Sequence, residues 1–312
     1  MNDQGAKGRP VGRGVGTRLA HRLSDAHCRI VDSEPKRDEI AYLCSDFIRH
    51  TLPHRQCASN TFERRNGEDA ITLMAPPTIG LPYGRWPRTI LSFLTTQAVR
   101  TNSREIDLGP SLSGFLKSLG AHSTGGATGT IRAFKLQAVR TLAMSVTLSR
   151  LDEVRAQLQN SPVADNFEIA WAGIGTDRRS GLPARVCLGE RIFHRMVTSA
   201  VPLDLRAVRA LQQSPMSFDL YAWLTYRAYR LPASHATLIA WEGLQAQFGA
   251  GYADQSDFKI AFRQALSRVK MVYPTIRCQM TDGHLVMHRS PPSVRHAPSR
   301  RSTKPADRPV DN

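Results

Sequence analysis

The sequence predicts an α+β fold of two tandem winged-helix domains with a pseudo-repeat, flanked by disordered basic tails. Residues 217–289 show the patterns of a helix, a short strand, a second helix, a long basic helix and a two-stranded hairpin, in that order. This order is typical of a winged helix. A weaker copy of the same order earlier in the chain and a large excess of positive charge support the prediction.

The earlier copy is visible as an internal repeat. Three pairs of segments align in the same order, with their apolar positions in phase: 88–100 with 218–230, 112–120 with 241–249, and 131–144 with 258–271. Repetition in order is the mark of a duplicated structural unit. We therefore expect a flexible basic N-terminal arm (1–37), an N-terminal winged-helix domain with extra strands (38–200), a C-terminal winged-helix domain (201–292) and a disordered basic tail (293–312).

The first domain is expected to open with a helix and a hairpin. Residues 38–49 have an acidic start followed by apolar residues at helical spacing, and Pro53 would end such a helix. Asn66-Gly67 between two strand-like runs is a strong hairpin signal. Further strand-like runs, which would form an enlarged wing or a small sheet, cover residues 146–148, 167–174 and 185–197. Flexible or basic turns are expected at 123–129 and 177–181, and a linker helix at 204–213.

Residues 254–273 form the long basic helix of the second domain. At about 100° per residue, Phe258, Phe262 and Val269 share an apolar face. The opposite face carries polar residues, which we predict to contact DNA: Ser256, Lys259, Arg263, Ser267 and Lys270. The hairpin after this helix would reach the neighbouring phosphates through Arg277, His288 and Arg289. The alternative is that this face is only the solvated side of an ordinary core helix.

The corresponding helix of the first domain, at 130–144, is a weaker candidate. Its DNA-binding candidates are Arg132, Lys135 and Arg140. Leu136 and Ala143 fall on the face that would be exposed, and exposed apolar side chains often mark a protein interface. We predict a dimerisation contact there. Packing of Leu136 on the extra strands is the alternative.

Charge and composition narrow the function. The chain has 42 Lys+Arg against 26 Asp+Glu, a net charge of +16, which favours a polyanionic partner. A membrane partner is not expected, because no apolar run approaches the roughly 20 residues of a spanning helix. The N-terminus lacks the apolar segment of a secretory signal. Five irregularly spaced cysteines fit reduced thiols in a cytoplasm.

Catalytic motifs are not expected. Residues 125–129 are glycine-rich but no lysine follows, so the phosphate-binding loop of an NTPase is missing. A nicking enzyme is not expected either, because no His-x-His pair is present. Cys44, His50, His54 and Cys57 have loose metal-like spacing, but Pro53 interrupts them and no common zinc motif matches. We expect no catalytic residue, no metal and no cofactor.

Several longer stretches resemble a known family, the RepA-type replication initiators of bacterial plasmids. The resemblance covers about residues 40–292, and its most specific words are GLPYG (80–84), TQAVR (96–100), FLKSLG (115–120), DLYAWLTYR (219–227) and WEGLQAQFG (241–249). It implies a non-enzymatic initiator in the bacterial cytoplasm, associated with its plasmid. Such a protein binds repeated double-stranded sites in the plasmid origin, opens the adjacent duplex and recruits the host replication initiator and helicase.

The resemblance also implies a division of labour and a monomer–dimer equilibrium. The C-terminal winged helix would be the main DNA reader, which points to Lys259, Arg263 and Lys270. The N-terminal one would mediate dimerisation and secondary DNA contacts, which points to residues 130–144. A winged-helix transcriptional regulator, including an autorepressor without an initiation role, is the alternative function.

Overall fold

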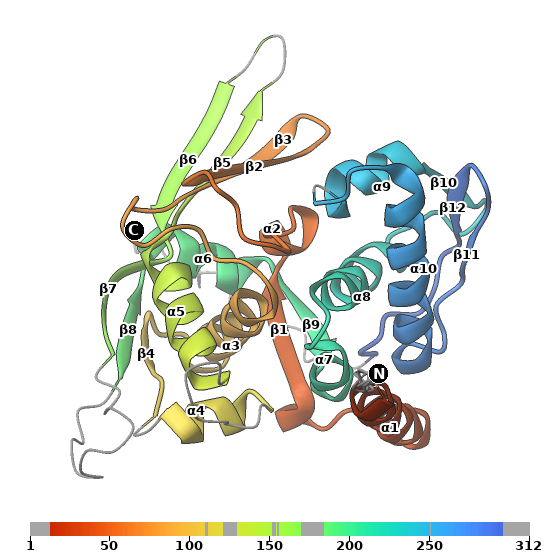
Figure 1. Cartoon of the computed structure of the whole chain (residues 1–312), viewed down its shortest axis with the longest axis horizontal. Coiled ribbons are helices and arrows are strands. Elements are labelled where there is room, and N and C mark those ends of the chain that lie inside the picture. The colour runs from red at the N-terminus through yellow and green to blue at the C-terminus, as the bar shows by residue number, and fades with distance from the viewer. Residues whose placement is uncertain are drawn as a thin grey trace, which may run out of the picture.

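Two winged-helix units lie side by side in the computed structural model, with an additional sheet above the first unit (Figure 1). The structure describes residues 13–109, 112–120, 130–151, 154, 156–169, 184–249 and 251–295. The predicted turns at 123–129 and 177–181, the first twelve residues of the predicted arm and the predicted tail from 296 onward lie outside these ranges.

The first winged helix follows the predicted order of elements. It comprises α3 (Arg85–Thr101), β4 (Glu105–Asp107), α4 (Leu112–Ser118), α5 (Thr130–Ala143), β7 (Ala164–Glu168) and β8 (Arg185–Leu188). The last strand pairs between the other two, in the order β4-β8-β7. Asn102 ends α3 in the left-handed conformation, at a φ of 52°, which asparagine tolerates better than most residues.

The second winged helix repeats this topology and confirms the predicted pseudo-repeat. It comprises α8 (Pro215–Ala228), β10 (Thr237–Ala240), α9 (Trp241–Phe248), α10 (Gln255–Val272), β11 (Cys278–Met280) and β12 (His284–Met287). Its strand order, β10-β12-β11, again places the last strand in the middle. The Asp-Gly pair forms the predicted hairpin turn, in which the Thr281 amide donates to the His284 carbonyl oxygen at 2.9 Å.

The two long helices align one residue away from the sequence alignment. The buried residues of α5 include Phe134, Gln137, Ala138 and Thr141, and those of α10 include Phe262, Ala265, Leu266 and Val269. Each pair is separated by one position more than the pairing of 131–144 with 258–271 assumes. The predicted register of this block is therefore wrong by one residue, because identical glutamines were matched where one is buried and the other exposed.

The extra strands form a four-stranded antiparallel sheet in the order β2-β3-β5-β6. Its strands are β2 (Thr61–Asn66), β3 (Asp69–Met74), β5 (Ser145–Leu151) and β6 (Ala156–Pro162). The predicted hairpin at Asn66-Gly67 is confirmed, with Gly67 at a φ of 65°. The predicted strand over 185–197 is wrong after Leu188, since α6 (Glu190–Thr198) follows. Ile192 and Met196, one helical turn apart, are its buried residues.

The predicted helix over 38–49 is also wrong. A 3-10 turn (Arg37–Glu39) leads into β1 (Ile40–Cys44), and only α2 (Ser45–Arg49) is helical. All five residues of β1 pair antiparallel with β9 (Ala200–Asp204), which lies far along the sequence. This ladder overrides the local helical spacing. It also joins the two predicted domains, because β9 spans their predicted boundary and the linker helix α7 (Leu205–Leu211) follows at once.

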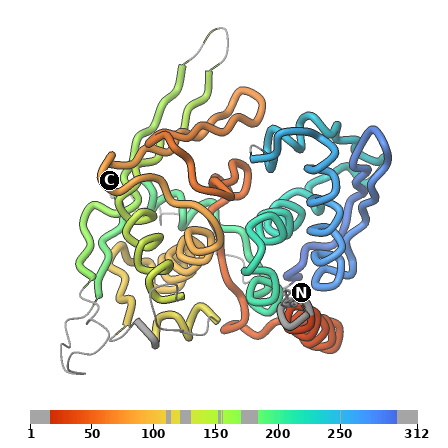
Figure 2. The backbone as a smooth tube through the Cα atoms, viewed as in Figure 1, coloured from red at the N-terminus to blue at the C-terminus, as the bar shows by residue number. Residues whose placement is uncertain are grey.

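The predicted flexible arm is wrong for residues 13–32, which form α1 (Arg13–Asp32). Leu23 and Ala26 of α1 are buried in the common core. The helix packs against α7 and α10, so this early segment of the chain lies against the second winged helix (Figure 2). The predicted tail is likewise wrong for its first residues, because Val294 is buried and Ser293 bonds to Tyr221. Both segments therefore pack against the second domain.

Candidate nucleic-acid interface

The start of α10 is fixed by a side-chain cap. The Asp254 carboxylate accepts a hydrogen bond from the Asp257 amide at 3.0 Å and from the Ser256 hydroxyl at 2.7 Å. The backbone hydrogen bond from Asp257 is the main reason that the pKa of Asp254 lies below its usual value. Ser256 is exposed as predicted, but its hydroxyl proton is engaged in this cap. The Ser256 oxygen remains available as a hydrogen-bond acceptor.

Aromatic contacts then set the rotation of α10 about its own axis. The ring of Phe262 meets Trp241 of α9 edge-on, with centroids 5.5 Å apart, and meets Phe248 at 6.1 Å. Phe258 adds a third contact with Trp241 at 6.4 Å. Such edge-to-face pairs combine a large buried area with a preferred geometry. They fix which side chains of α10 point outward.

The outward face is cationic and polar, as predicted, but it also carries exposed residues outside the predicted set. Arg263, Ser267 and Lys270 are exposed. Three residues that the sequence reasoning did not select lie among them: Ile260, Gln264 and Met271. Counting about 100° per residue from the buried Phe258 and Phe262 would have placed Ile260 on the outward face. Ile260 carries no charge, so the charge pattern of the helix does not select it.

Lys259 has a structural role at the edge of this face. Its ammonium group donates to the Asp282 carbonyl oxygen at 3.1 Å and lies 5.3 Å from the Trp241 ring centroid. The side chain is half-buried. It therefore ties the first turn of α10 to the hairpin turn of the wing, and two of its three N–H donors remain for a phosphate.

The three wing residues sit at the base of the hairpin. Arg277, His288 and Arg289 are all exposed. The His288 amide donates to the Arg277 carbonyl oxygen at 2.9 Å, and the Arg277 amide donates to the Ser290 hydroxyl at the same distance. These backbone bonds hold the base of the wing while the side chains point to solvent. Their positions suit contacts with a DNA backbone beside the groove that α10 would occupy.

The helix α5 of the first domain offers fewer free cations. Arg132 is exposed and Lys135 is half-buried. Arg140 donates to the Ile79 carbonyl oxygen at 2.8 Å, and its guanidinium lies 5.4 Å from the Tyr83 ring centroid. Arg140 therefore holds the loop before α3. Among the three candidates Arg132 has the most accessible charge.

The predicted dimerisation residues are only partly available. The Leu136 side chain is 46% exposed, whereas Ala143 is half-buried. The alternative, in which Leu136 is covered by the extra strands, is therefore not what the structure shows. A large apolar side chain left at the surface of α5 fits a contact with another protein.

A buried ion pair joins the two winged helices. Arg88 of α3 donates through Nε and Nη2 to the two carboxylate oxygens of Asp219 of α8, each at 2.7 Å. The remaining N–H groups of Arg88 bond to the carbonyl oxygens of Leu52, Pro53 and Gly84. His54 Nε2 adds a bond to Asp219 at 2.8 Å. The Nε and both terminal nitrogens of Arg88 and both carboxylate oxygens of Asp219 have partners, which makes the geometry of this cluster specific.

The protonation states follow from burial and from these partners. Burial alone would raise the pKa of Asp219, but the Arg88 charge and the hydrogen bonds hold it below its ordinary value. Burial lowers the pKa of His54 more than Asp219 raises it, so the ring is neutral at pH 7 and donates as an ordinary N–H. The cluster therefore contains one cation and one anion, and it sets the relative orientation of α3 and α8.

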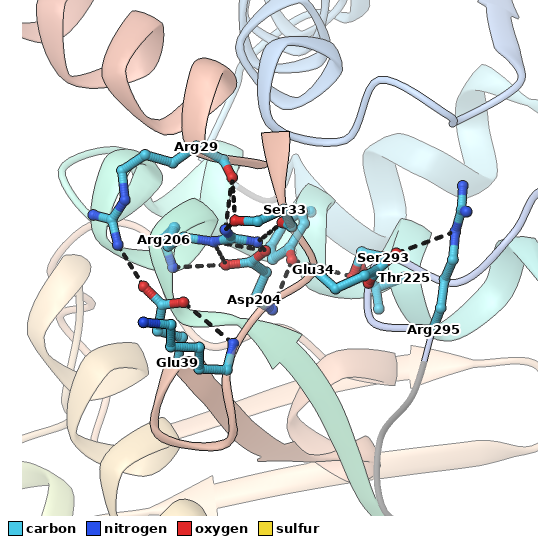
Figure 3. Close-up of polar contacts among 11 residues, drawn as sticks. Arg29, Ser33, Glu34, Glu39, Asp204, Arg206, Thr225, Ser293 and Arg295 are labelled. Carbon is cyan, nitrogen blue, oxygen red and sulfur yellow. Dashed lines mark hydrogen bonds and ion pairs between the residues drawn. The ribbon is translucent and has the colours of Figure 1, made fainter. Parts of the chain in front are cut away.

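A second polar cluster holds α1 in place. The Arg206 guanidinium bonds to Asp204 at 2.7 Å and also donates to the carbonyl oxygens of Arg29, at 2.7 Å, and Ser33, at 3.0 Å (Figure 3). The C-terminal segment joins from the other side, where Ser293 bonds to Thr225 (Figure 3). One arginine thus connects α1, β9 and α7.

The loose metal-like cluster is not assembled. Burial raises the pKa of the Cys44 thiol, and His54 is engaged with Asp219. Within the described ranges there is no group of three or more His, Cys, Asp or Glu side chains placed to hold a metal ion. In the same ranges, no helix has both the length and the apolar character needed to cross a bilayer.

These features define a tandem winged-helix protein whose second domain presents a capped helix with a cationic and polar outward face. The profile of the family described as plasmid encoded RepA protein matches residues 81–243, which cover α3 to the start of α9. The chain belongs to this family of plasmid-encoded RepA proteins. Membership supports a role in the initiation of plasmid replication, as the sequence resemblance implied.

Two solved structures resemble the fold. A crystal structure of selenomethionine derivatives of domains 2 and 3 of RctB matches with a TM-score of 0.50 and 10% sequence identity, over 78% of this chain and 98% of that one. A second crystal structure of RctB domains 2–3 matches with a TM-score of 0.47 and 13% identity, over 77% and 93% of the two chains. Comparison with curated proteins finds no match.

Proposed function

We propose that this protein is a non-enzymatic plasmid replication initiator that binds repeated double-stranded sites in its origin, with α10 as the main reader. The observation that carries the proposal is the outward face of α10, on which Arg263, Ser267 and Lys270 are exposed and the helix start is capped. With 18 residues, α10 is about 27 Å long. The major groove, about 12 Å wide, admits one such helix.

The first domain would add a second, weaker contact with the same DNA. Successive major grooves on one face of B-DNA are about 34 Å apart, and a fixed spacing between reading helices is the usual way to match that repeat. The buried Arg88–Asp219 pair supplies such a fixed relation between the two domains. Arg132 is the residue on α5 that we assign to phosphate contact, and Leu136 is assigned to dimerisation.

Duplex opening and recruitment of the host initiator and helicase complete the proposal. The support for these two steps is family membership, since initiation of plasmid replication requires both. The surface available for host proteins includes the four-stranded sheet, whose outer strand β6 is exposed along most of its length. Neither step requires a catalytic residue of this chain.

The test of DNA binding is a salt titration on the origin fragment that accompanies the gene, combined with footprinting. Log Kd should change linearly with log salt, by about 0.9 for each phosphate contact. Lys270→Ala should reduce this slope by about one. Arg65→Ala, which removes an exposed arginine from β2, is the matched control and should leave the slope unchanged. Binding that does not respond to salt would contradict the proposal.

The test of initiation is replication in trans. A plasmid that carries the origin fragment but lacks this gene should replicate only when the protein is supplied from elsewhere. Replication without the protein, together with repression of its own promoter, would show the autorepressor instead. A cleaved origin strand on a denaturing gel would show a nicking enzyme and would contradict the non-enzymatic role.

A further inference from the structure

We propose that Ile260 and Gln264 are specificity-determining residues that read an A·T base pair in the major groove, with Ile260 contacting the thymine methyl group. This inference rests on the proposed function and goes beyond it, because it names a base and two residues that the charge pattern of α10 does not select.

Ile260 occupies the centre of the outward face of α10. The six buried residues of this helix are Phe258, Phe262, Ala265, Leu266, Val269 and Val272. At about 100° per residue, their mean direction is about 170° from that of Ile260. Ile260 is therefore the residue that points most directly away from the core, and its side chain is 53% exposed.

The surroundings of Ile260 are polar and available. Arg263 and Gln264 are the next exposed residues toward the C-terminus, and Ser256 lies one turn before. Within the described ranges, neither Arg263 nor Gln264 has a side-chain hydrogen bond or ion pair, although the Arg263 backbone carbonyl accepts from Ser267. Isolated apolar residues are common on protein surfaces. Ile260, on the second turn of α10, has exposed polar residues suited to base edges on either side of it.

The first domain provides an internal comparison. When the buried residues of α5 and α10 are aligned, Arg132 takes the position of Ile260, and Leu136 takes that of Gln264. The two helices thus share a framework but differ at the centre of their outward faces. A cation at this position suits a phosphate or a guanine, whereas an isoleucine suits neither. At this one position, therefore, α10 is suited to meet an apolar group and α5 is suited to meet an anion or an acceptor.

The chemistry of the groove identifies that group. Thymine C5-methyl is the apolar group that a standard base pair presents in the major groove, and adenine N6 and N7 form the pair of sites that a glutamine amide binds. Gln264 lies one turn after Ile260, on the same side of the helix. The two side chains can therefore engage the same A·T pair or adjacent ones. Arg263 remains for a neighbouring guanine.

The C-terminal end of α10 lies against α1. The His27 ring of α1 bonds to the Met271 carbonyl oxygen at 2.7 Å, which places α1 alongside the last turn of the helix. Met271 itself is 38% exposed. The groove wall would meet α1 near this turn, so base reading is assigned to the segment from Ser256 to Ser267.

The test removes methyl groups from the DNA and from the protein in turn. Thymines of one origin repeat are replaced singly by uracil, which lacks only the C5-methyl, and Kd is measured for the wild-type protein and Ile260→Ala. At one or two positions, uracil should weaken wild-type binding about fourfold, the effect of withdrawing one methyl from an apolar contact. The variant should bind thymine DNA more weakly and should not distinguish uracil from thymine at those positions.

Gln264 is tested with 7-deazaadenine at the adenines of the same repeat. Loss of the N7 acceptor at one adenine should weaken wild-type binding about fivefold and should leave Gln264→Ala unaffected. Leu158→Ala is the matched control for Ile260→Ala, because Leu158 is a 60% exposed leucine on β6. It should bind thymine and uracil DNA as the wild type does.

Three results would overturn the inference. Tight wild-type binding that is indifferent to uracil at every position leaves the proposed function standing and removes the role of Ile260. Equal sensitivity to uracil in the wild type and in Ile260→Ala assigns the methyl contact to another residue. Equal sensitivity to 7-deazaadenine in Gln264→Ala does the same for the adenine contact. Absence of any preference for origin DNA would contradict the proposed function itself.

Discussion

Asp219→Asn tests whether the buried cluster between the two winged helices is a major source of stability. Asp219 is 5% exposed and Arg88 is 1% exposed, so removing the negative charge leaves the guanidinium buried with no counter-ion. Breaking a buried pair from one side costs about 3–5 kcal/mol. Asparagine keeps one oxygen for Arg88, and the carbonyl partners of Arg88 remain, so we expect the lower end, about 3 kcal/mol.

The assay is urea unfolding of the full chain, followed by tryptophan fluorescence. Trp86 lies two residues before Arg88, and Trp223 lies four residues after Asp219, so each side of the cluster has a reporter. The control is Glu63→Gln, which breaks the exposed Arg65–Glu63 pair and should cost about 0.5 kcal/mol or less. A loss for Asp219→Asn no larger than that of the control would refute the reasoning.

The pH dependence of the same variant gives a second check. The folded-state pKa of Asp219 is held below the ordinary 3.8, so the pair stabilises the protein above that pH and loses its contribution as the pH falls further. The difference in unfolding free energy between the wild type and Asp219→Asn should therefore be constant near neutrality and shrink in acid. A difference that grows as the pH falls toward 3 would contradict this assignment.

Three further predictions concern single residues. Arg263→Ala should cost about 1–3 kcal/mol on origin DNA and less on random DNA, measured by competition binding; an equal loss on both would show a phosphate contact only. Leu136→Asp should shift sedimentation equilibrium toward the monomer, whereas Leu238→Asp, at a 60% exposed leucine on β10, should not; unchanged self-association would exclude α5 as the interface. The His54 pKa lies below the ordinary 6.5 because the ring is buried, so unfolding takes up a proton and stability falls as the pH drops below 6.5. His54→Gln should flatten that decline in urea titrations at pH 7 and 5.5, and an unchanged slope would show that the proton is taken up elsewhere.

Local signals in the sequence were sufficient where the structure is also local. The Asn-Gly and Asp-Gly turns, the amphipathic α10 and the order of elements in both winged helices follow from neighbouring residues. Each of these elements is correctly predicted because its side chains mainly satisfy contacts within one domain. The internal repeat strengthened the winged-helix prediction, because the same order of elements occurs twice in the sequence.

These local signals do not predict pairing between strands that are distant in the sequence. Residues 38–49 have helical spacing, yet β1 forms because β9 is available to it far along the chain. The glycine and arginine content of α1 predicted a flexible arm, although Leu19, Leu23 and Ile30 form an apolar stripe that packs against the core. At the interface, charge identified Arg263 and Lys270 but not Ile260, and it overstated Lys259 and Arg140. Whether a cation faces solvent or holds a loop depends on neighbours that are distant in sequence.

The position of α1 has a consequence for synthesis. This helix is made early, but its packing partners α7 and α10 are made about 180 and 240 residues later. At translation rates of about 5–20 residues per second, its apolar stripe waits on the order of ten seconds or more before a stable site exists. During that interval the nascent chain exposes the stripe to chaperones and to other chains. Completion of the second winged helix is therefore also the step that buries the apolar stripe of α1.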